Sequence, residues 1–157
     1  MHPANDNPGV IAPPPLLYAA ALGIGLAVDF LVVRVQTGLP ASLRYGLAAI
    51  LAVLAIALAL SALFRFRRVG THAEPWRPTT AIVTDGVYAF TRNPMYVGMT
   101  LLYLAIAIAA DSVIALVLVI PLLAAVRYGV VAREERYLEA KFGDEYRRYK
   151  AAVRRWV

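Results

Sequence analysis

The sequence predicts an all-α, polytopic membrane protein with about four transmembrane helices and a C-terminal amphipathic helix. Hydrophobic residues make up 61% of the 157 positions, and the mean hydropathy is +0.63. A water-soluble domain of this size has too little polar surface to cover so apolar a composition. The apolar residues also fall into four long stretches, which turn-forming or charged residues separate. We therefore expect one domain built from membrane-spanning helices.

Net charge and cysteine content exclude several classes of function. The formal net charge is +6, which in a soluble protein would suggest a nucleic-acid partner. Here the basic residues flank apolar stretches, so we expect membrane lipids as partners and no nucleic acid. The chain has no cysteine, which excludes disulfides, thiolate metal sites and cysteine nucleophiles. We also expect no metal site, and we favour a role on the loop surface for the isolated His72.

The first part of the chain predicts a lead-in followed by a helical hairpin. Residues 1–15 are rich in turn-forming residues and lack the basic start of a signal peptide, so we expect a flexible lead-in. Residues 16–33 and 43–64 are apolar runs whose helical lengths suit the roughly 30 Å hydrocarbon core. The Gly-Pro sequence at residues 37–42 predicts a tight turn between antiparallel helices. Residues 16–68 therefore form the first predicted hairpin.

Asp29 lies inside the first apolar run, where a carboxylate usually marks a function. Arg34 and Arg44 flank the same end of this predicted helix. We favour a structural ion pair with an arginine, or a protonated carboxyl group, over a proton relay.

The second part of the chain predicts a loop and another hairpin. Residues 69–93 are polar and contain Gly, Pro and several charges, and they form the only sizeable loop. Pro94 suits the first turn of a helix, where its missing N–H would have no partner. Residues 94–132 form the second predicted hairpin, with a kink at Pro121. Its two spans are residues 95–110 and 113–132.

The C-terminal tail, residues 133–157, is strongly charged. Its apolar residues recur three to five positions apart, as in an amphipathic helix that lies on a membrane or on protein. We expect Gly143 to interrupt this helix.

The distribution of basic residues predicts the orientation in the membrane. Of the 16 Lys and Arg residues, 14 occur at Arg65 or later, on the side that the long loop and the tail share. Because basic residues are enriched in cytoplasmic segments, this side is expected to be cytoplasmic. With four spans, both termini are then cytoplasmic.

Two polar clusters are expected at this face. Arg92 stands at the start of the third span, where it either contacts an anion beside the helix N-terminus or fixes the helix depth by snorkelling. Glu134 and Glu135 directly follow the fourth span, and neighbouring side chains on a helix point about 100° apart. One carboxylate is therefore expected to face inward, where it suits a nucleotide-like cofactor, while the other pairs with a basic residue. The alternative is a solvated helical turn.

An ordered motif extends across both clusters, over residues 79–150. It consists of Gly86, Tyr88, Arg92, Asn93, Pro94, Tyr96 and Gly98, followed by Glu134, Glu135, Leu138, Phe142, Gly143, Glu145, Tyr146 and Tyr149. This motif resembles that of the isoprenylcysteine carboxyl methyltransferase and phospholipid N-methyltransferase group of membrane methyltransferases. That family usually has His at the position of Asn93, and the first two spans resemble it only in being hydrophobic.

The resemblance implies a pocket for S-adenosylmethionine that opens to the cytoplasm. The loop, the start of the third span and the end of the fourth span would form it. The implied cofactor contacts are Thr80, Ala81, Ile82, Val83, Tyr88, Asn93, Pro94, Met95, Tyr96, Glu134 and Glu135. The implied catalytic residues are Arg92 and Glu134. Arg92 would orient an anionic substrate group or the cofactor carboxylate, and Glu134 would hold the cofactor, with Glu135 in the same role or as its support.

The implied reaction is methyl transfer to a lipid-like or prenylated substrate, with carboxyl methylation of the isoprenylcysteine type favoured. Two departures bear on this choice. Asn93 cannot carry the charge of a histidine, and Val130 occupies a position where the carboxyl methyltransferases of the family have arginine. Phospholipid amine or small-thiol methylation is an alternative, as is a noncatalytic membrane binding or scaffold protein. The sequence does not indicate an oligomeric state.

Overall fold

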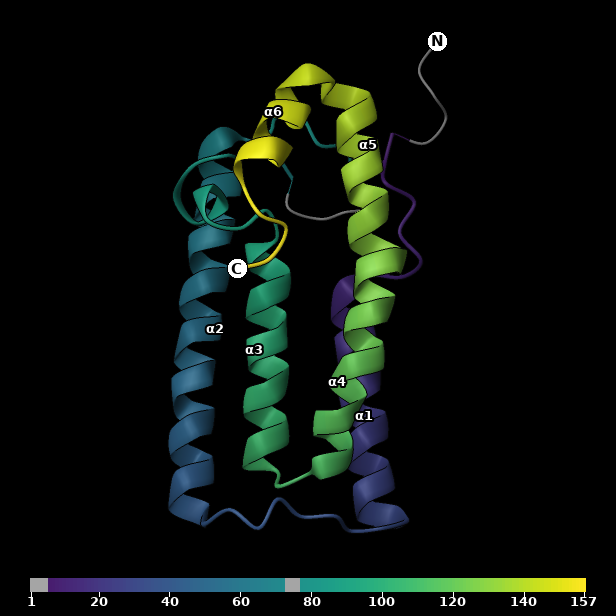
Figure 1. Ribbon diagram of the computed structural model, residues 1–157, viewed down its shortest axis with the longest axis vertical. Helices are drawn as coiled ribbons and strands as arrows, with labels where there is room; N and C mark the ends of the chain where they lie inside the picture. The colour runs from purple at the N-terminus through teal and green to yellow at the C-terminus, as the bar shows by residue number, and fades with distance from the viewer. Residues whose placement is uncertain (1–5, 73–76) are drawn as a thin grey trace.

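The computed structural model describes residues 6–72 and 77–157, and these are helical with no β-strand (Figure 1). The all-α prediction is therefore confirmed for the described part of the chain. The helices are α1 (Pro14–Leu31), α2 (Ala41–Val69), the 3₁₀ turn η1 (Gly86–Ala89), α3 (Pro94–Ala109), α4 (Val113–Val126), the π-helical turn η2 (Arg127–Val131), α5 (Ala132–Phe142) and α6 (Asp144–Ala152).

Three helical stretches are long and apolar enough to cross a membrane. They are α1, α2 and the continuous helix Val113–Phe142, which joins α4, η2 and α5. The fourth apolar helix, α3, has 16 residues and is therefore only about 24 Å long. Pro94 occupies the first turn of α3, which confirms the predicted start of this helix.

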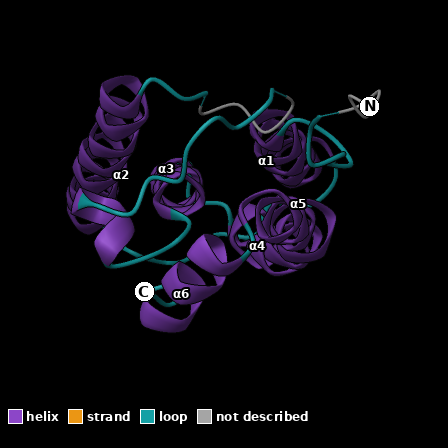
Figure 2. Ribbon diagram, turned by 90° about the horizontal axis from the view of Figure 1, so that it is seen from above, coloured by secondary structure: helices purple, strands orange, loops and turns teal. Residues whose placement is uncertain are grey.

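The short α3 lies between α2 on one side and α1 with α4 on the other (Figure 2). It packs along α2, while α1 packs mainly on α4. α1 approaches α4 closely at Gly25, where an added Cβ would lie 2.7 Å from the Cα of Ala115. Small residues at such a point let two membrane helices approach closely.

The predicted tight turn between the first two helices is wrong. Their connection is a long one, residues 32–40, and it passes beneath α3 and α4 from one flank of the bundle to the other (Figure 1). Contacts with the α3–α4 turn hold it in place: Val113 donates its N–H to the carbonyl of Val35 at 3.1 Å, and Thr37 donates its N–H to Asp111 at 2.9 Å. The turn-forming residues thus belong to a connection that crosses the bundle, and α1 and α2 pack mainly on α4 and α3.

Asp29 forms a structural ion pair, as the sequence analysis favoured. Its side chain is buried, and its carboxylate accepts from Arg34 Nη1 at 2.9 Å and from the N–H of Val35 at 3.0 Å. Arg44 is directed instead toward Asp111, with 3.7 Å between Nη1 and Oδ2. Both carboxylates therefore fasten the connection at the end of the bundle that is remote from α5 and α6.

At the other end, residues 6–13 form a packed segment, here called the N-terminal strap. The N–H of Ile11 donates to the carbonyl of Gly129 at 3.2 Å, and Arg133 Nη1 donates to the carbonyl of Gly9 at 2.7 Å. The flexible lead-in predicted for residues 1–15 is therefore wrong for the described residues, and residues 1–5 lie outside them. The turn-rich composition was misleading because polar groups of η2 and α5 are available to bind this backbone.

The fourth span continues without a break into the charged tail. Pro121 lies within α4, but the change from α-helical hydrogen bonding occurs further along, in η2. π-helical turns often accompany functional sites, and η2 lies directly before the paired glutamates. Gly143 has φ +55° and separates α5 from α6, which confirms the predicted interruption.

Candidate functional site

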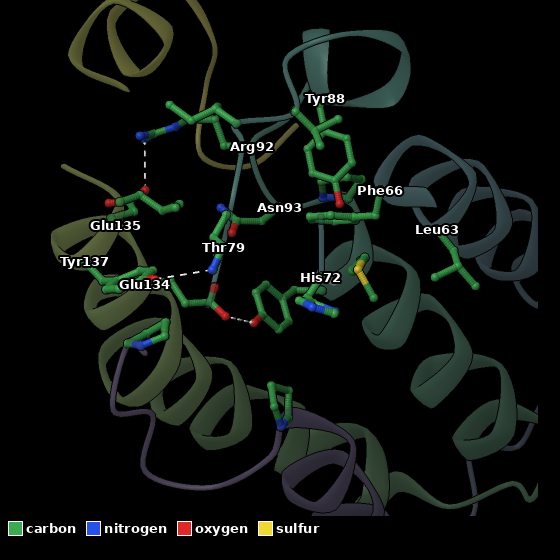
Figure 3. A pocket seen from close by; sticks show the side chains of 18 of the residues that line it. Leu63, Phe66, His72, Thr79, Tyr88, Arg92, Asn93, Glu134, Glu135 and Tyr137 are labelled. Carbon is green, nitrogen blue, oxygen red and sulfur yellow. Dashed lines mark hydrogen bonds and ion pairs between the residues drawn. The ribbon is translucent and has the colours of Figure 1, made fainter. Parts of the chain in front are cut away.

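A cavity of about 380 Å³ lies above the N-terminus of α3, at the end of the bundle that carries α5 and α6 (Figure 3). Its position follows from helix length, since α2 and α5 extend beyond the point where the short α3 begins (Figure 1). The N-terminal strap, α2, the loop after α2, η1, α3, α5 and α6 all contribute to its lining. A volume of this size is typical of a small-molecule site.

Glu134 faces the cavity and accepts a hydrogen bond from the Tyr96 hydroxyl at 2.5 Å (Figure 3). It belongs to α5, beyond the apolar part of the fourth span. Burial raises the pKa of Glu134 to about 7, against the opposing effect of the Tyr96 hydrogen bond. This carboxyl group can therefore gain or lose a proton near neutral pH.

Glu135 turns away from Glu134 and pairs with two arginines. Arg155 forms a bidentate pair with its carboxylate, with distances of 2.9 and 2.7 Å, and Arg92 Nη2 lies 3.2 Å from Oε1. Of the two adjacent carboxylates, Glu134 thus faces the cavity and Glu135 pairs with basic residues, as the helical geometry suggested. Glu135 joins α5 to the start of α3 and to the C-terminal segment.

Arg92 is buried, with only 8% of its side chain exposed. Its Nε and Nη1 atoms have no hydrogen-bond partner among the described residues, although the residue lines the cavity. Buried donors of this kind normally have an acceptor. Arg92 therefore offers two unused donors beside the cavity, which suits an anionic group.

The C-terminal segment after α6 braces the residues around Arg92. The N–H of Arg92 donates to the carbonyl of Arg154 at 2.9 Å. The side chains of Thr91 and Asn93 both donate to the carbonyl of Arg155, at 3.1 and 2.9 Å. Asn93 thus lines the cavity while its amide group holds the chain end, a role for which an amide donor is sufficient.

Aromatic side chains form much of the remaining wall. The Tyr149 hydroxyl donates to the carbonyl of Tyr88 at 2.7 Å, and Tyr88 packs edge-on against Phe66. Burial, and next the charge of Glu135, raise the pKa of Tyr146 to about 12. Burial likewise raises the pKa of Tyr88 and of Tyr149. These hydroxyls therefore stay neutral at physiological pH, and the rings offer π-faces to a bound cation.

The loop after α2 closes one side of the cavity. Ala81, Ile82 and Val83, which the sequence predicted as cofactor contacts, line it. Thr80 is not among the lining residues, and its N–H donates to Thr71 Oγ1 at 2.9 Å. This hydrogen bond secures the loop, and the cofactor contact of Thr80 stays a prediction.

The structure brings the other predicted site residues together around one cavity. Those that line it are Ala81, Ile82, Val83, Tyr88, Arg92, Asn93, Pro94, Met95, Tyr96, Glu134 and Glu135. Further lining residues carry no signal in the sequence motif. They are the apolar residues Ala59, Leu63 and Met99 of the membrane spans, together with Pro8, His72 and Tyr137.

The described residues contain no group of three His, Asp or Glu side chains that could hold a metal ion. His72 lines the cavity and is exposed. The charged residues of the lining are Arg92, Glu134 and Glu135, and this mixture of charges suits an organic ligand with both positive and negative ends.

One protein family and one relative match this chain. The family described as "Phospholipid methyltransferase" matches residues 43–145. An uncharacterized protein of Haemophilus influenzae is 46% identical over 63 residues, which are 40% of this chain and 100% of that protein. No solved structure matches the chain.

Proposed function

Because this chain belongs to the phospholipid methyltransferase family, we propose that it catalyses S-adenosylmethionine-dependent methyl transfer to a lipid-like substrate at the cytoplasmic face of a membrane. The observation that carries the proposal is that a carboxyl group, Glu134, and a guanidinium group, Arg92, both line one cavity. A carboxyl group and a guanidinium with unused donors complement the ammonium and carboxylate groups of the cofactor. The basic loop and tail support a cytoplasmic position for this end.

The residues present fit the cofactor. Glu134 would balance its positive charge, and Arg92 would bind its carboxylate through Nε and Nη1. The rings of Phe66, Tyr88 and Tyr149 would lie against its cationic and aromatic parts. When bound, S-adenosylmethionine would supply a methyl group on a sulfonium: an acceptor nucleophile would bond to the methyl carbon as the carbon–sulfur bond breaks, with neutral S-adenosylhomocysteine as the leaving group.

The chain's own contribution to the reaction would be alignment and exclusion of water. Ala59, Leu63 and Met99 give the cavity an apolar wall next to the membrane-spanning part of the bundle. The hydrocarbon part of a substrate would rest there, with its nucleophile directed to the methyl group. Correct alignment of two bound reactants accounts for a large part of such a rate enhancement.

For the methyl acceptor we favour a lipid amine over a carboxylate. Arg92 is the only arginine or lysine among the described residues that line the cavity, and we assign it to the cofactor. Val130 is fully buried in η2, and Arg127 is exposed. A substrate carboxylate would then have no cationic partner, whereas an amine needs none, since it attacks in its neutral form after releasing a proton to water.

The first test is calorimetric titration of the protein in nanodiscs with S-adenosylhomocysteine. We expect binding by the wild type and at least about a tenfold loss of affinity in Glu134→Gln. Glu139→Gln, on the exposed side of the same helix in a pair with Lys150, should bind like the wild type. Failure of the folded wild type to bind, in nanodiscs and in detergent, would contradict the proposal and favour the noncatalytic alternative.

The acceptor is identified by transfer of labelled methyl groups. Phosphatidylethanolamine, a prenylcysteine and a small thiol are supplied separately to the wild type. We expect label in phosphatidylethanolamine, and label in the prenylcysteine alone would overturn the assignment of the acceptor while leaving the cofactor site intact.

The affinity for S-adenosylhomocysteine should depend on pH through Glu134. Because its pKa is about 7, Glu134 is mostly neutral at pH 6 and mostly ionised at pH 8. The ionised form attracts the ammonium group of the ligand, so Kd should fall by about tenfold between these pH values. The Glu134→Gln variant should show no such change, and an equal pH dependence in both proteins would assign the titration to another group.

A further inference from the structure

The N-terminal strap has one firmly held part. The N–H of Ile11 binds the carbonyl of Gly129, and the Ile11 side chain fills the space beside that glycine, where an added Cβ would lie 2.3 Å from Ile11 Cδ1. Arg133 binds the carbonyl of Gly9 at 2.7 Å. Residues 9–13 are therefore anchored to η2 and α5 by backbone and apolar contacts.

The other end of the strap is held by a contact that is easier to break. Asp6 accepts from the Tyr137 hydroxyl at 2.7 Å and from Lys141 Nζ at 2.8 and 2.6 Å. The side chains of Asp6 and Lys141 are 42% and 28% exposed. Ion pairs with this exposure are weak and are screened by salt.

A turn separates the anchored part from the latched part. Gly9 has φ +61°, a conformation that glycine adopts without strain, and its N–H donates to Asn7 Oδ1 at 2.9 Å. Pro8 lies on the latched side of this turn and lines the cavity. Motion about Gly9 would therefore carry Pro8 toward or away from the cavity.

Tyr137 joins the strap to the loop on the opposite side of the cavity. The hydroxyl that donates to Asp6 also accepts from the N–H of Thr79 at 3.3 Å (Figure 3). Two residues further along, Ala81 lines the cavity. One side chain of α5 thus holds two covering segments from different parts of the chain.

We propose that residues 6–8 are a lid over the cofactor cavity, and that Tyr137 is the positioning residue that latches the lid through Asp6 and the loop through Thr79. Opening of the latch lets ligand leave and return, while the anchor at Ile11 keeps the strap in place. The inference rests on the proposed function for the identity of the ligand. Closure of the cavity itself can be measured without any ligand.

Closure is tested by cysteine labelling, for which the chain is well suited because it has no cysteine of its own. Ala81→Cys is introduced as the only thiol, and its rate of reaction with a water-soluble maleimide is measured in nanodiscs. Adding Asp6→Asn or Tyr137→Phe should accelerate labelling at least about fivefold. Raised salt should accelerate labelling in the Ala81→Cys background and have little further effect with Asp6→Asn.

Two controls keep this result specific. Glu139→Gln breaks another exposed ion pair of α5, with Lys150 at 3.0 Å, and should leave the labelling rate unchanged. Asp6→Glu keeps the negative charge and should restore slow labelling. Equal labelling rates in the presence and absence of Asp6→Asn and Tyr137→Phe would overturn the lid, whether or not the protein binds a cofactor.

The second measurement is the dissociation rate of S-adenosylhomocysteine from proteins that retain Ala81. Asp6→Asn and Tyr137→Phe should raise this rate at least about fivefold, with a smaller fall in affinity because association is also faster. Unchanged dissociation from variants that bind the ligand would show that residues 6–8 do not control exchange. Lack of binding by the wild type would instead contradict the proposed function, and the labelling experiment would still decide the lid.

Discussion

Replacing Glu135 with alanine is expected to lower the free energy of unfolding by about 3 kcal/mol or more and to abolish cofactor binding. Glu135 and Arg92 are each only 8% exposed, and Arg155 binds the same carboxylate. Removal of one member of a buried ion pair costs roughly 3–5 kcal/mol, because a charge is left buried without its partner. Among the described residues the ion pair of Arg92 is with Glu135, and two further donors of Arg92 have no partner there.

The measurement is thermal unfolding in detergent, followed by intrinsic fluorescence, together with titration of S-adenosylhomocysteine. Arg155→Ala should have a smaller effect, since Glu135 then keeps Arg92. Asp144→Asn removes an exposed pair with Arg147 and should cost less than about 1 kcal/mol. An unchanged melting temperature in Glu135→Ala would show that these arginines are not held in place by the carboxylate.

Gly25→Leu is expected to have the second large effect, through the packing of α1 on α4. A Cβ at Gly25 would lie 2.7 Å from the Cα of Ala115, and because that atom belongs to the backbone, no side-chain rotation relieves the overlap. Overpacking costs about 1–3 kcal/mol even where neighbours can adjust. We expect a loss at the upper end of this range, with α1 displaced from α4.

Gly23→Leu is a matched control, because it places the same side chain on the same helix. An added Cβ at Gly23 meets no atom within 4 Å, so the melting temperature in detergent should stay close to that of the wild type. A similar loss of stability in both variants would attribute the effect to helix α1 itself and not to its contact with Ala115.

Hydrophobic runs were sufficient to predict α1 to α4, because a membrane-spanning helix is largely apolar over about 20 residues. The starts and ends of α2 and α3 agree with the sequence to within a few residues. Which helices pack against each other could not be predicted in the same way. The link between the first two helices looked like a tight turn, and nothing in its composition revealed that Asp111 would bind Thr37.

The sequence motif predicted many of the residues that line the candidate site, but it did not predict their partners. The helical geometry of Glu134 and Glu135 was enough to expect one inward and one paired carboxylate. The identity of the pairing residue was not, since Arg155 lies 20 positions away in a separate segment. The sequence also did not reveal that the backbone N–H of Thr80 binds Thr71.

The placement of α1 and α2 on opposite flanks has a consequence for how the protein is made. The Tyr18 hydroxyl in α1 bonds to Thr100, 82 positions further along the chain, and Gly25 meets Ala115 later still. When the ribosome has delivered α1 and α2 to the bilayer, α1 has not yet received its main partner. Each early helix must therefore be stable in lipid by itself, and final assembly waits for the fourth helix to be inserted.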